Sequence, residues 1–546
     1  MNVGELVASY LEEIGVDTAF GVISIHNMPI LDAIHRRRRI RFVPARSESG
    51  AVNMADACSR VSGKLGVAVT STGTAAGNAS GAMVEALSAG TPLLHLTGQI
   101  DSPYLDRDLG YLHEARDQLG MLRAVSKSAC RIANGAEAGH ILRTAVESAL
   151  TPPRGPVSIE IPIDVQQAAG VPWKIKTPSV QRIPPAPLDA LTERLSRAKR
   201  PLLWLGGGAR DAGEAVRKLV DKGFGVVTSV QGRGILPEDH PMSLGAFNVS
   251  PAVEALYGTC DALLVAGSRL RSNETLGYKL KLPRPLYRID AEPKRADHPY
   301  GSDVFVSGDC ADVLARIADL QISVDPAFAR DLAAARKAAE TQARAGLGPY
   351  DTLVDELQRL AGRDFIWVRD VTVSNSTWGN RLLRIFGPRD GVHALGGGIG
   401  QGLQMAIGAS IAGKGRKVLC LAGDGGLALN LGELGTLVQE KANVAIVLMN
   451  DQGYGVIRNI QDAQYGGRRC YVDLATPDFC LLAKAYGLPH FRVAGRNEFR
   501  PALEKAIALA GPAVVEVDMN TVGPYAAAFA GPPVRKEEAP RRETEP

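Results

Sequence analysis

Short apolar runs alternate with segments of helical periodicity along almost the whole chain. This alternation is typical of parallel sheets whose strands are connected by covering helices, because both faces of such a sheet are buried. The runs fall into three groups, and a chain of 546 residues is too long for one hydrophobic core. We therefore expect an α/β fold of three doubly wound parallel-sheet domains, at residues 1–170, 185–340 and 350–530, followed by a disordered charged tail at 531–546.

Charge and cysteine content exclude several classes of protein. The formal net charge of +4 is small for this length, so we expect no nucleic-acid partner. The basic run HRRRRIR (35–41) is interpreted as a solvated connection, with a phosphate-binding patch as the alternative. Seven scattered cysteines without a C-x-x-C pair indicate reduced thiols in a cytoplasmic protein. No apolar run approaches the roughly 20 residues of a membrane span.

Two strands of the third group end in acids set among glycines. They read KVLCLAGDGG (417–426) and VAIVLMNDQGYG (444–455). A GDGG turn that leads into a helix offers free N–H groups to a phosphate, but its aspartate would repel the phosphate unless a cation stood between them. Mg²⁺ binds carboxylates and phosphate oxygens together, so Asp424 and Asp451 are expected to share one ion if their strands are neighbours.

A simpler interpretation of the two turns remains open at this stage. Asp424 would then cap a helix that begins near Leu427, and Asn450 and Asp451 would form an ordinary turn. Two such turns at the ends of two strands favour the metal site over this alternative.

Residues 423–455 resemble the thiamine diphosphate motif, in which GDG is followed by an asparagine pair at the end of an apolar strand. The family usually has Asn-Asn where this chain has Asn450-Asp451, so the second ligand here is a carboxylate. The resemblance implies thiamine diphosphate and Mg²⁺ as cofactors, with Asp424, Asp451 and the Gly453 carbonyl as metal ligands. It also implies cofactor contacts for Gly423, Gly425, Gly426 and Tyr454.

Two further segments of the third group carry the resemblance. LGGGIGQGLQMAIGAS (395–410) is similar to the glycine-rich segment before the GDG strand in acetolactate synthases and benzoylformate decarboxylases. The resemblance implies that Gly398 contacts the cofactor and that Ile399 is the large apolar side chain that supports its bent shape. The alternative is that Ile399 is a core residue and that the glycines only allow close helix packing. In VTVSNSTW (371–378) the resemblance implies Ser374 and Asn375 at the diphosphate, with a plain polar loop as the alternative.

The first domain is expected to supply the acid–base group. RFVPARSESGAVNMADACSR (41–60) resembles the family segment that carries the catalytic glutamate, which makes Glu48 the carboxylate at the aminopyrimidine ring. Ser47 stands where the family has histidine. The alternative is a glutamate that only complements a helix dipole. TSTGTAAGNASGAMVEAL (70–87) is similar to the family run S-G-P-G-x-x-N, and Gly73 and Asn78 are matched at its two ends.

Two histidines are expected near the reacting carbon. By the resemblance, His26 lies in FGVISIHNMP (20–29), which aligns with a family loop over that carbon, and His113 lies in GYLHEARDQ (110–118). Either could transfer a proton or orient a substrate carboxylate. The alternative for each is an ordinary surface histidine.

The resemblance covers nearly the whole chain and is strongest to the acetolactate synthases. It implies a thiamine diphosphate- and Mg²⁺-dependent enzyme that decarboxylates or ligates a 2-oxo acid through an enamine intermediate. The alternatives are a 2-oxo acid decarboxylase or C–C lyase similar to benzoylformate decarboxylases and, less favoured, a non-catalytic relative. A nicotinamide dehydrogenase is set aside because no strand is followed by G-x-G-x-x-G.

Two further expectations follow from this resemblance. Because Glu48 and Asp424 belong to different domains that meet between chains in this family, it implies a homodimer at least and more often a homotetramer. FAD is kept as an alternative cofactor only, since GSRLRSNETLG (267–277) differs from the corresponding run of flavin-binding synthases.

Overall fold

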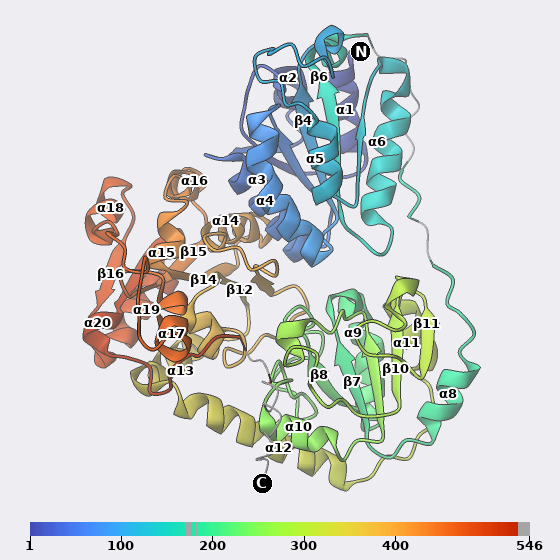
Figure 1. Cartoon of the computed structure of the whole chain (residues 1–546), viewed down its shortest axis with the longest axis vertical. Coiled ribbons are helices and arrows are strands. Elements are labelled where there is room, and N and C mark those ends of the chain that lie inside the picture. The colour runs from blue at the N-terminus through green and yellow to red at the C-terminus, as the bar shows by residue number, and fades with distance from the viewer. Residues whose placement is uncertain (170–176, 181–182, 533–534, 536–546) are drawn as a thin grey trace, which may run out of the picture.

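Three separate parallel sheets organise the chain in the computed structural model, which describes residues 1–169, 177–180, 183–532 and 535. The first and third sheets have six strands and the central sheet has five. Figure 1 shows the three domains as distinct bodies, each with helices on both faces of its sheet. The predicted α/β fold of three doubly wound parallel-sheet domains is therefore confirmed.

The first domain has the strand order β2-β1-β3-β4-β6-β5. Its strands are β1 (Thr18–Gly21), β2 (Arg41–Pro44), β3 (Gly66–Thr70), β4 (Leu93–Gln99), β5 (Ser128–Arg131) and β6 (Pro156–Pro162). Its helices are α1 (Val3–Glu13), α2 (Met28–Arg37), α3 (Glu48–Ser62), α4 (Thr74–Ala89), α5 (Gln118–Val125), α6 (Gly135–Leu150) and α7 (Ile163–Gln167). Strands β3, β4 and β6 are buried along their whole length, as expected for strands covered on both faces.

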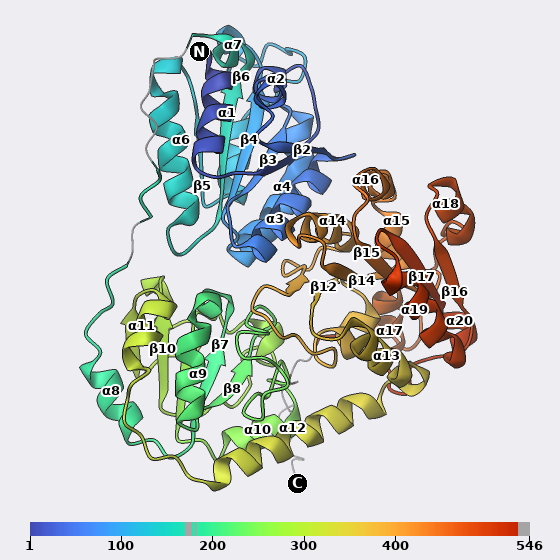
Figure 2. The same ribbon diagram turned by 180° about the vertical axis from the view of Figure 1, so that it is seen from behind.

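The central domain has the strand order β11-β10-β9-β7-β8. Its strands are β7 (Pro201–Leu205), β8 (Gly225–Thr228), β9 (Ala262–Ala266), β10 (Leu286–Asp290) and β11 (Val304–Ser307). Its helices are α8 (Asp189–Ser196), α9 (Gly213–Asp221), α10 (Pro251–Tyr257) and α11 (Cys310–Ile317). A long helix, α12 (Ala327–Ala345), then runs along the base of the molecule to the third domain, as Figures 1 and 2 show from opposite sides.

The third domain has the strand order β13-β12-β14-β15-β17-β16. Its strands are β12 (Phe365–Arg369), β13 (Gly391–His393), β14 (Lys417–Gly423), β15 (Val444–Asn450), β16 (His490–Val493) and β17 (Ala513–Asp518). Its helices are α13 (Asp351–Ala361), α14 (Gly402–Ala412), α15 (Asp424–Ala428), α16 (Glu433–Gln439), α17 (Gly455–Gln464), α18 (Phe479–Ala485), α19 (Phe499–Ala508) and α20 (Met519–Val522). Strands β14 and β15 are parallel neighbours, so the two acidic turns leave the same edge of the sheet.

The first and third domains are joined by the packing of α3 against α14. Figure 2 shows the two helices side by side, and their residues share one hydrophobic cluster. A Cβ atom on Gly408 would lie 2.1 Å from the Met54 carbonyl oxygen, so only glycine allows this approach. Within the contact the buried Asn53 Nδ2 donates to Gln404 Oε1 at 2.5 Å. Close packing is thus one role of the glycines and alanines in residues 402–412.

Other expectations concern features outside the sheets. All seven cysteines are free thiols. Within the described ranges, no helix is long and apolar enough to cross a membrane. Of the tail predicted at 531–546, only residues 531, 532 and 535 are described, and the rest lies outside the described residues.

A buried ion pair connects the central domain to the third. The Arg233 guanidinium donates to both carboxylate oxygens of Glu238 at 2.6 Å, and the two side chains are 1% and 2% exposed. Arg233 also donates to the carbonyl oxygens of Asn380 and Leu383, while Glu238 accepts the N–H of Ile385. The Arg233–Glu238 pair therefore forms hydrogen bonds with the backbone of the third domain, at Asn380, Leu383 and Ile385.

We expect Arg233→Met to destabilise the protein by about 3–5 kcal/mol, because it leaves the Glu238 carboxylate buried and uncompensated. Urea unfolding followed by circular dichroism measures this loss. The matched control is Arg197→Met, which breaks an exposed pair with Glu193 whose side chains are 75% and 65% exposed and should cost less than about 1 kcal/mol. Equal losses in the two variants would contradict the account.

Candidate functional site

Asp424 and Asp451 meet at the carboxyl ends of β14 and β15. Asp424 is 1% exposed and its carboxylate accepts the N–H of Asp451 at 3.2 Å and the N–H of Gly453 at 2.9 Å. Helix α15 begins at Asp424 itself, not near Leu427, because this carboxylate bridges to the neighbouring turn instead of capping a later helix. The geometry thus brings together the two acids that the sequence pattern selected.

The pKa values of the two carboxyl groups are raised above that of an ordinary aspartate. Burial, and then the negative charge of Asp424, raise the pKa of Asp451, while Arg458 opposes the shift from 3.7 Å away. Burial also raises the pKa of Asp424, and the N–H groups that it accepts limit that shift. Two neighbouring carboxylates repel each other when both are ionised. A divalent cation bound between them would remove this repulsion and lower both pKa values.

The first residue of the asparagine–aspartate pair has a structural role. Asn450 Nδ2 donates to Glu516 Oε1 at 2.7 Å, and Asn450 Oδ1 accepts the N–H of Gln452. Gln452 has a φ of 57°, a left-handed conformation that makes the turn tight. Asn450 therefore fixes the turn, and this leaves Asp451 and the Gly453 carbonyl as the groups available to an ion.

The donor set at the acid pair fits Mg²⁺ with a diphosphate. No cluster of three or more His, Cys, Asp or Glu side chains occurs among the described residues, so an ion at this pair would take its other ligands from backbone carbonyls and phosphate oxygens. A Cβ on Gly425 would lie 2.8 Å from the Gly453 oxygen and 2.9 Å from the Tyr454 ring. A Cβ on Gly426 would lie 3.2 Å from Asp370 Oδ2. Gly423 ends β14 directly before these residues.

The other predicted contacts of the third domain surround these turns. Ser374 is buried and accepts a hydrogen bond from the Tyr525 hydroxyl at 2.8 Å. Asn375 is 3% exposed and its Oδ1 has no hydrogen-bond partner, so a polar ligand could engage it. Ile399 is 40% exposed and not a core residue, and Gly398 precedes it in the same loop. All four residues follow β12 or β13 at the carboxyl edge of the sheet.

Sequence reasoning missed Asp370, which anchors that loop. Its carboxylate accepts the N–H groups of Val371, Gly400 and Gly402 at 2.7, 3.1 and 3.3 Å. Burial raises the pKa of Asp370 to about 6. The signal that could have found it is the same as for Asp424, an acid directly after an apolar strand.

In the first domain Glu48 is the first residue of α3, and Asn78 of α4 holds its carboxylate. Asn78 Nδ2 donates to Glu48 Oε2 at 3.1 Å. Ser47 caps α3, since its Oγ accepts the N–H of Gly50 at 3.0 Å. Glu48 is half-buried and Asn78 is exposed in the single chain, so the pair lies at an open surface.

Gly73, His26 and His113 lie together beside this pair. A Cβ on Gly73 would lie 2.1 Å from the His113 carbonyl oxygen, and both residues have a positive φ. The rings of His26 and His113 stand edge to face with centroids 5.2 Å apart. His26 is 5% exposed; burial and the neighbouring His113 lower its pKa, and its Nδ1 has no partner. His113 is exposed.

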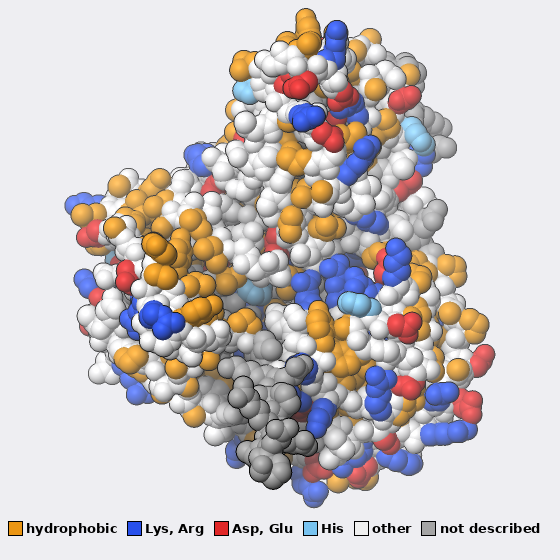
Figure 3. All heavy atoms as spheres, in the orientation of Figure 1, with side chains coloured by type: hydrophobic (Ala, Val, Ile, Leu, Met, Phe, Trp, Pro, Cys, Tyr) orange, Lys and Arg blue, Asp and Glu red, His pale blue; other side chains and the backbone are white. Residues whose placement is uncertain are grey.

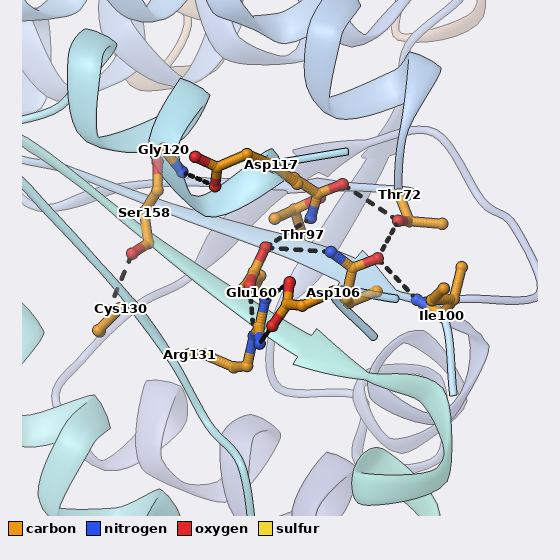
Figure 4. A network of polar contacts seen from close by, with 12 residues as sticks. Thr72, Thr97, Ile100, Asp106, Asp117, Gly120, Cys130, Arg131, Ser158 and Glu160 are labelled. Carbon is orange, nitrogen blue, oxygen red and sulfur yellow. Dashed lines mark hydrogen bonds and ion pairs between the residues drawn. The ribbon is translucent and has the colours of Figure 1, made fainter. Parts of the chain in front are cut away.

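Figure 4 shows a polar network of the first domain, and one of its hydrogen bonds reaches the backbone of Gly73. Gln118 Oε1 accepts the N–H of Gly73 at 2.7 Å, and Gln118 Nε2 donates to Glu160 Oε2 at 2.9 Å. Arg131 neutralises Glu160 through a contact of 2.5 Å and also pairs with Asp106. The network fixes the loop that carries Gly73. Sequence reasoning singled out neither Glu160 nor Gln118, although Gln118 is the last residue of the segment GYLHEARDQ (110–118) that contains His113.

The two groups of residues are separate within one chain. No hydrogen bond or ion pair among the described residues joins the group around Glu48 to the turn at Asp424. The α3–α14 contact explains this separation, because it uses the side of α3 for packing and leaves its first residue outside the contact.

Three family models match the chain in the order of its domains. They describe the N-terminal TPP binding domain, the central domain and the C-terminal TPP binding domain of thiamine pyrophosphate enzymes, and they match residues 1–121, 188–317 and 372–517.

Several curated proteins are similar along the whole chain. A probable acetolactate synthase large subunit of Methanococcus aeolicus is 28% identical over 543 residues, covering 93% of this chain and 90% of that protein. A probable 2-ketoarginine decarboxylase of Pseudomonas aeruginosa is 31% identical over 538 residues, covering 95% and 94%. The acetolactate synthase isozyme 2 large subunit of Escherichia coli is 26% identical, covering 95% and 96%.

The raised pKa of Asp451 predicts how stability depends on pH when no metal is bound. The folded pair keeps a proton that the unfolded chain releases above about pH 4. Folding stability therefore falls as the pH rises from there until the pair itself ionises. Each pH unit in that window costs up to about 1.4 kcal/mol.

We expect Asp451→Asn to remove most of this slope in the melting temperature of metal-free protein. The matched control is Asp473→Asn, which removes another carboxylate partner of Arg458 whose side chain is 79% exposed. The control should keep the slope, and added Mg²⁺ should flatten it both in the parent protein and in the control, since both retain the acid pair. Identical slopes in the parent protein and Asp451→Asn would contradict the shared-proton account.

Proposed function

The chain belongs to the thiamine pyrophosphate enzyme family, and from this membership we propose a Mg²⁺-dependent enzyme that acts on a 2-oxo acid. The favoured reaction is the ligation of two carbonyl compounds with loss of carbon dioxide, as in the acetolactate synthases. Simple decarboxylation is the alternative, and the similarity to a probable 2-ketoarginine decarboxylase supports it. The observation that carries the proposal is the pair formed by the buried Asp424 and the half-buried Asp451 beside Gly425.

In this proposal the third domain holds the diphosphate end of the cofactor. Asp424, Asp451 and the Gly453 carbonyl would bind Mg²⁺, because oxygen ligands at one strand edge suit this ion. Gly425 allows the turn after β14 to lie directly against the Gly453 carbonyl oxygen and the Tyr454 ring, which keeps the two acidic turns together. Ser374 and Asn375 lie along the same edge and would contact the diphosphate. Ile399 would support the cofactor from its exposed position.

The first domain would supply the proton-transfer groups. When bound, thiamine diphosphate supplies a carbon nucleophile that takes up the electron pair released with carbon dioxide. Glu48 would hold a proton between its carboxylate and a nitrogen of the aminopyrimidine ring, and Asn78 orients that carboxylate. His26 and His113 would orient the substrate carboxylate or move a proton to product, since their rings stand edge to face and His113 lies beside Gly73.

We further propose a homodimer at least, and a homotetramer as the working assembly. Exposed apolar side chains accompany both half-sites: Ile23, Ile25 and Leu112 near the histidines, and Ile399 and Leu429 near the acid pair. Figure 3 shows hydrophobic side chains gathered over the third domain. An apolar surface around an incomplete site is what association of two copies would cover. The domain limits 1–170, 185–340 and 350–530 and a cytoplasmic location, consistent with seven free thiols, complete the proposal.

Turnover of three 2-oxo acids tests the function. Pyruvate, benzoylformate and 2-ketoarginine are given to cofactor-free protein with and without thiamine diphosphate and Mg²⁺, and carbon dioxide and ligated product are measured separately. We expect cofactor-dependent acetolactate from pyruvate. Carbon dioxide without ligated product would favour the decarboxylase alternative, and no cofactor-dependent turnover of any acid would contradict both.

Glu48→Gln is the matched variant for this assay. It should fold and bind thiamine diphosphate as the parent does while turnover falls by about a hundredfold or more, because the proton at the ring nitrogen is no longer held by a carboxylate. Unchanged turnover would remove Glu48 from its proposed role.

FAD is the alternative additional cofactor, and a cavity between the first and central domains is its candidate site. The cavity has a volume of about 390 Å³, and Figure 3 shows Lys and Arg side chains gathered where these domains meet. The arginines that line it are Arg60, Arg154, Arg210, Arg269, Arg271, Arg295 and Arg389. Burial and neighbouring arginines lower the pKa of Arg210 and of Arg269 to about 10, so an anionic ligand would relieve their repulsion.

Calorimetric titration with FAD and with ADP tests this alternative. Binding of both would assign the cavity to phosphate-bearing ligands, and Arg210→Met should then raise each Kd by about tenfold or more. Binding of FAD alone would indicate that the flavin ring is also recognised. Lack of binding by either compound would remove FAD from the cofactors of this chain.

A further inference from the structure

Glu433, the first residue of α16, reaches from the third domain to the start of α3 in the first domain. It is 1% exposed, and its Oε1 accepts the N–H of Arg46 at 3.1 Å, the N–H of Ser47 at 3.0 Å and the hydroxyl of Ser47 at 3.0 Å. Its Oε2 accepts the hydroxyl of Thr436 at 2.7 Å. Both carboxylate oxygens are thus fully engaged, and three of the four donors belong to the two residues directly before Glu48.

The local sequence is adapted to this carboxylate. A Cβ on Gly50 would lie 2.1 Å from Glu433 Oε1, so a side chain at that position would displace it. Ser47 uses its hydroxyl twice, as donor to Glu433 and as the acceptor that caps α3. The positive end of the α3 dipole also favours a buried negative charge at this place. The Glu433 carboxylate of α16 is therefore an integral part of the structure at the start of α3.

We propose that Glu433 is a positioning residue for Glu48, an inference that rests on the proposed function. Glu433 fixes the backbone of Arg46 and Ser47, and Asn78 fixes the Glu48 carboxylate from the other side at 3.1 Å. Glu48 is therefore positioned in two ways, through the backbone that precedes it and through its carboxylate. A misplacement of about 1 Å can cost a catalytic group roughly a hundredfold in rate, so the backbone contact has a direct chemical consequence.

The same segment also carries the metal turn. Asp424 begins α15, and the chain continues from there to Glu433 at the start of α16, with the N–H of Glu433 donating to the Asn430 carbonyl. In the proposed dimer Asp424 and Glu48 of one chain serve different cofactors. This segment therefore touches one cofactor site through Asp424 and sets the geometry of the other through Glu433.

The test compares Glu433→Met with Glu433→Gln. Methionine keeps the length of the side chain but leaves the N–H groups of Arg46 and Ser47 without an acceptor, whereas glutamine can keep a carbonyl oxygen at the Oε1 position. The readouts are the melting temperature, the Kd for thiamine diphosphate in the presence of Mg²⁺, and the rate at which the C2 proton of bound thiamine diphosphate exchanges with D₂O. None of these needs knowledge of the substrate.

At saturating thiamine diphosphate, Glu433→Met should slow the exchange by about tenfold to a hundredfold while Kd changes much less. Glu433→Gln should restore most of the rate. Glu440→Met is the control, because Glu440 pairs with Arg41 across the same domain boundary without touching the start of α3. If Glu433→Met fails to fold, Gly50→Ala displaces the carboxylate without removing it and should slow the exchange in the same way.

A normal exchange rate in saturated Glu433→Met, with only Kd or melting temperature changed, would overturn the inference and leave Glu433 a structural residue. Glu48→Gln separates this outcome from failure of the proposed function. Slow exchange in Glu48→Gln with normal exchange in Glu433→Met rejects the positioning role alone. Normal exchange in Glu48→Gln would reject the role of Glu48 and, with it, the inference built on it.

Discussion

The packing of α3 against α14 is the contact on which the arrangement of the site depends. Its closeness comes from Gly408, where the backbone of α14 meets the Met54 carbonyl oxygen with no room for a Cβ. Because α3 begins with Glu48, the contact that ties the first domain to the third also determines where that carboxylate faces. The side of α3 is buried in the contact and its first residue stays at the surface.

Buried carboxylates at helix and strand ends organise both half-sites. Asp424 accepts the N–H groups of the next turn, Asp370 accepts those of the glycine-rich loop, and Glu433 accepts those at the start of α3. A buried negative charge is costly unless hydrogen bonds or cations compensate it, and backbone N–H groups provide fixed donors at known positions. The hydrogen bonds that compensate the burial of these carboxylates also fix the backbone of the loops that donate them. Asp451 differs, because the oppositely charged group nearest to its carboxylate is the Arg458 guanidinium at 3.7 Å.

Acids that follow long apolar strands could be predicted from the sequence, and the pair Asp424 and Asp451 came from that pattern together with the glycines around it. Glu48, Asn78 and Gly73 came from similarity to a family, and the structure places them together. Asp370 shared the strand-end pattern but lacked a glycine turn to single it out. No local pattern singled out Gln118, Glu160 and Glu433, because their partners are distant in the sequence: Gln118 and Glu433 bind backbone N–H groups, and Glu160 binds the Gln118 side chain.

The sequence by itself determined the three α/β domains and the residues that end their strands, since periodicity and turn chemistry are local properties. Only the tertiary structure decided that β14 and β15 are neighbours, that Asn450 fixes the turn while Asp451 stays available, and that Glu433 reaches α3. It also decided that Glu48 lies apart from Asp424 within one chain. These outcomes depend on contacts between residues hundreds of positions apart, and close packing across domains sets such contacts where local pattern cannot.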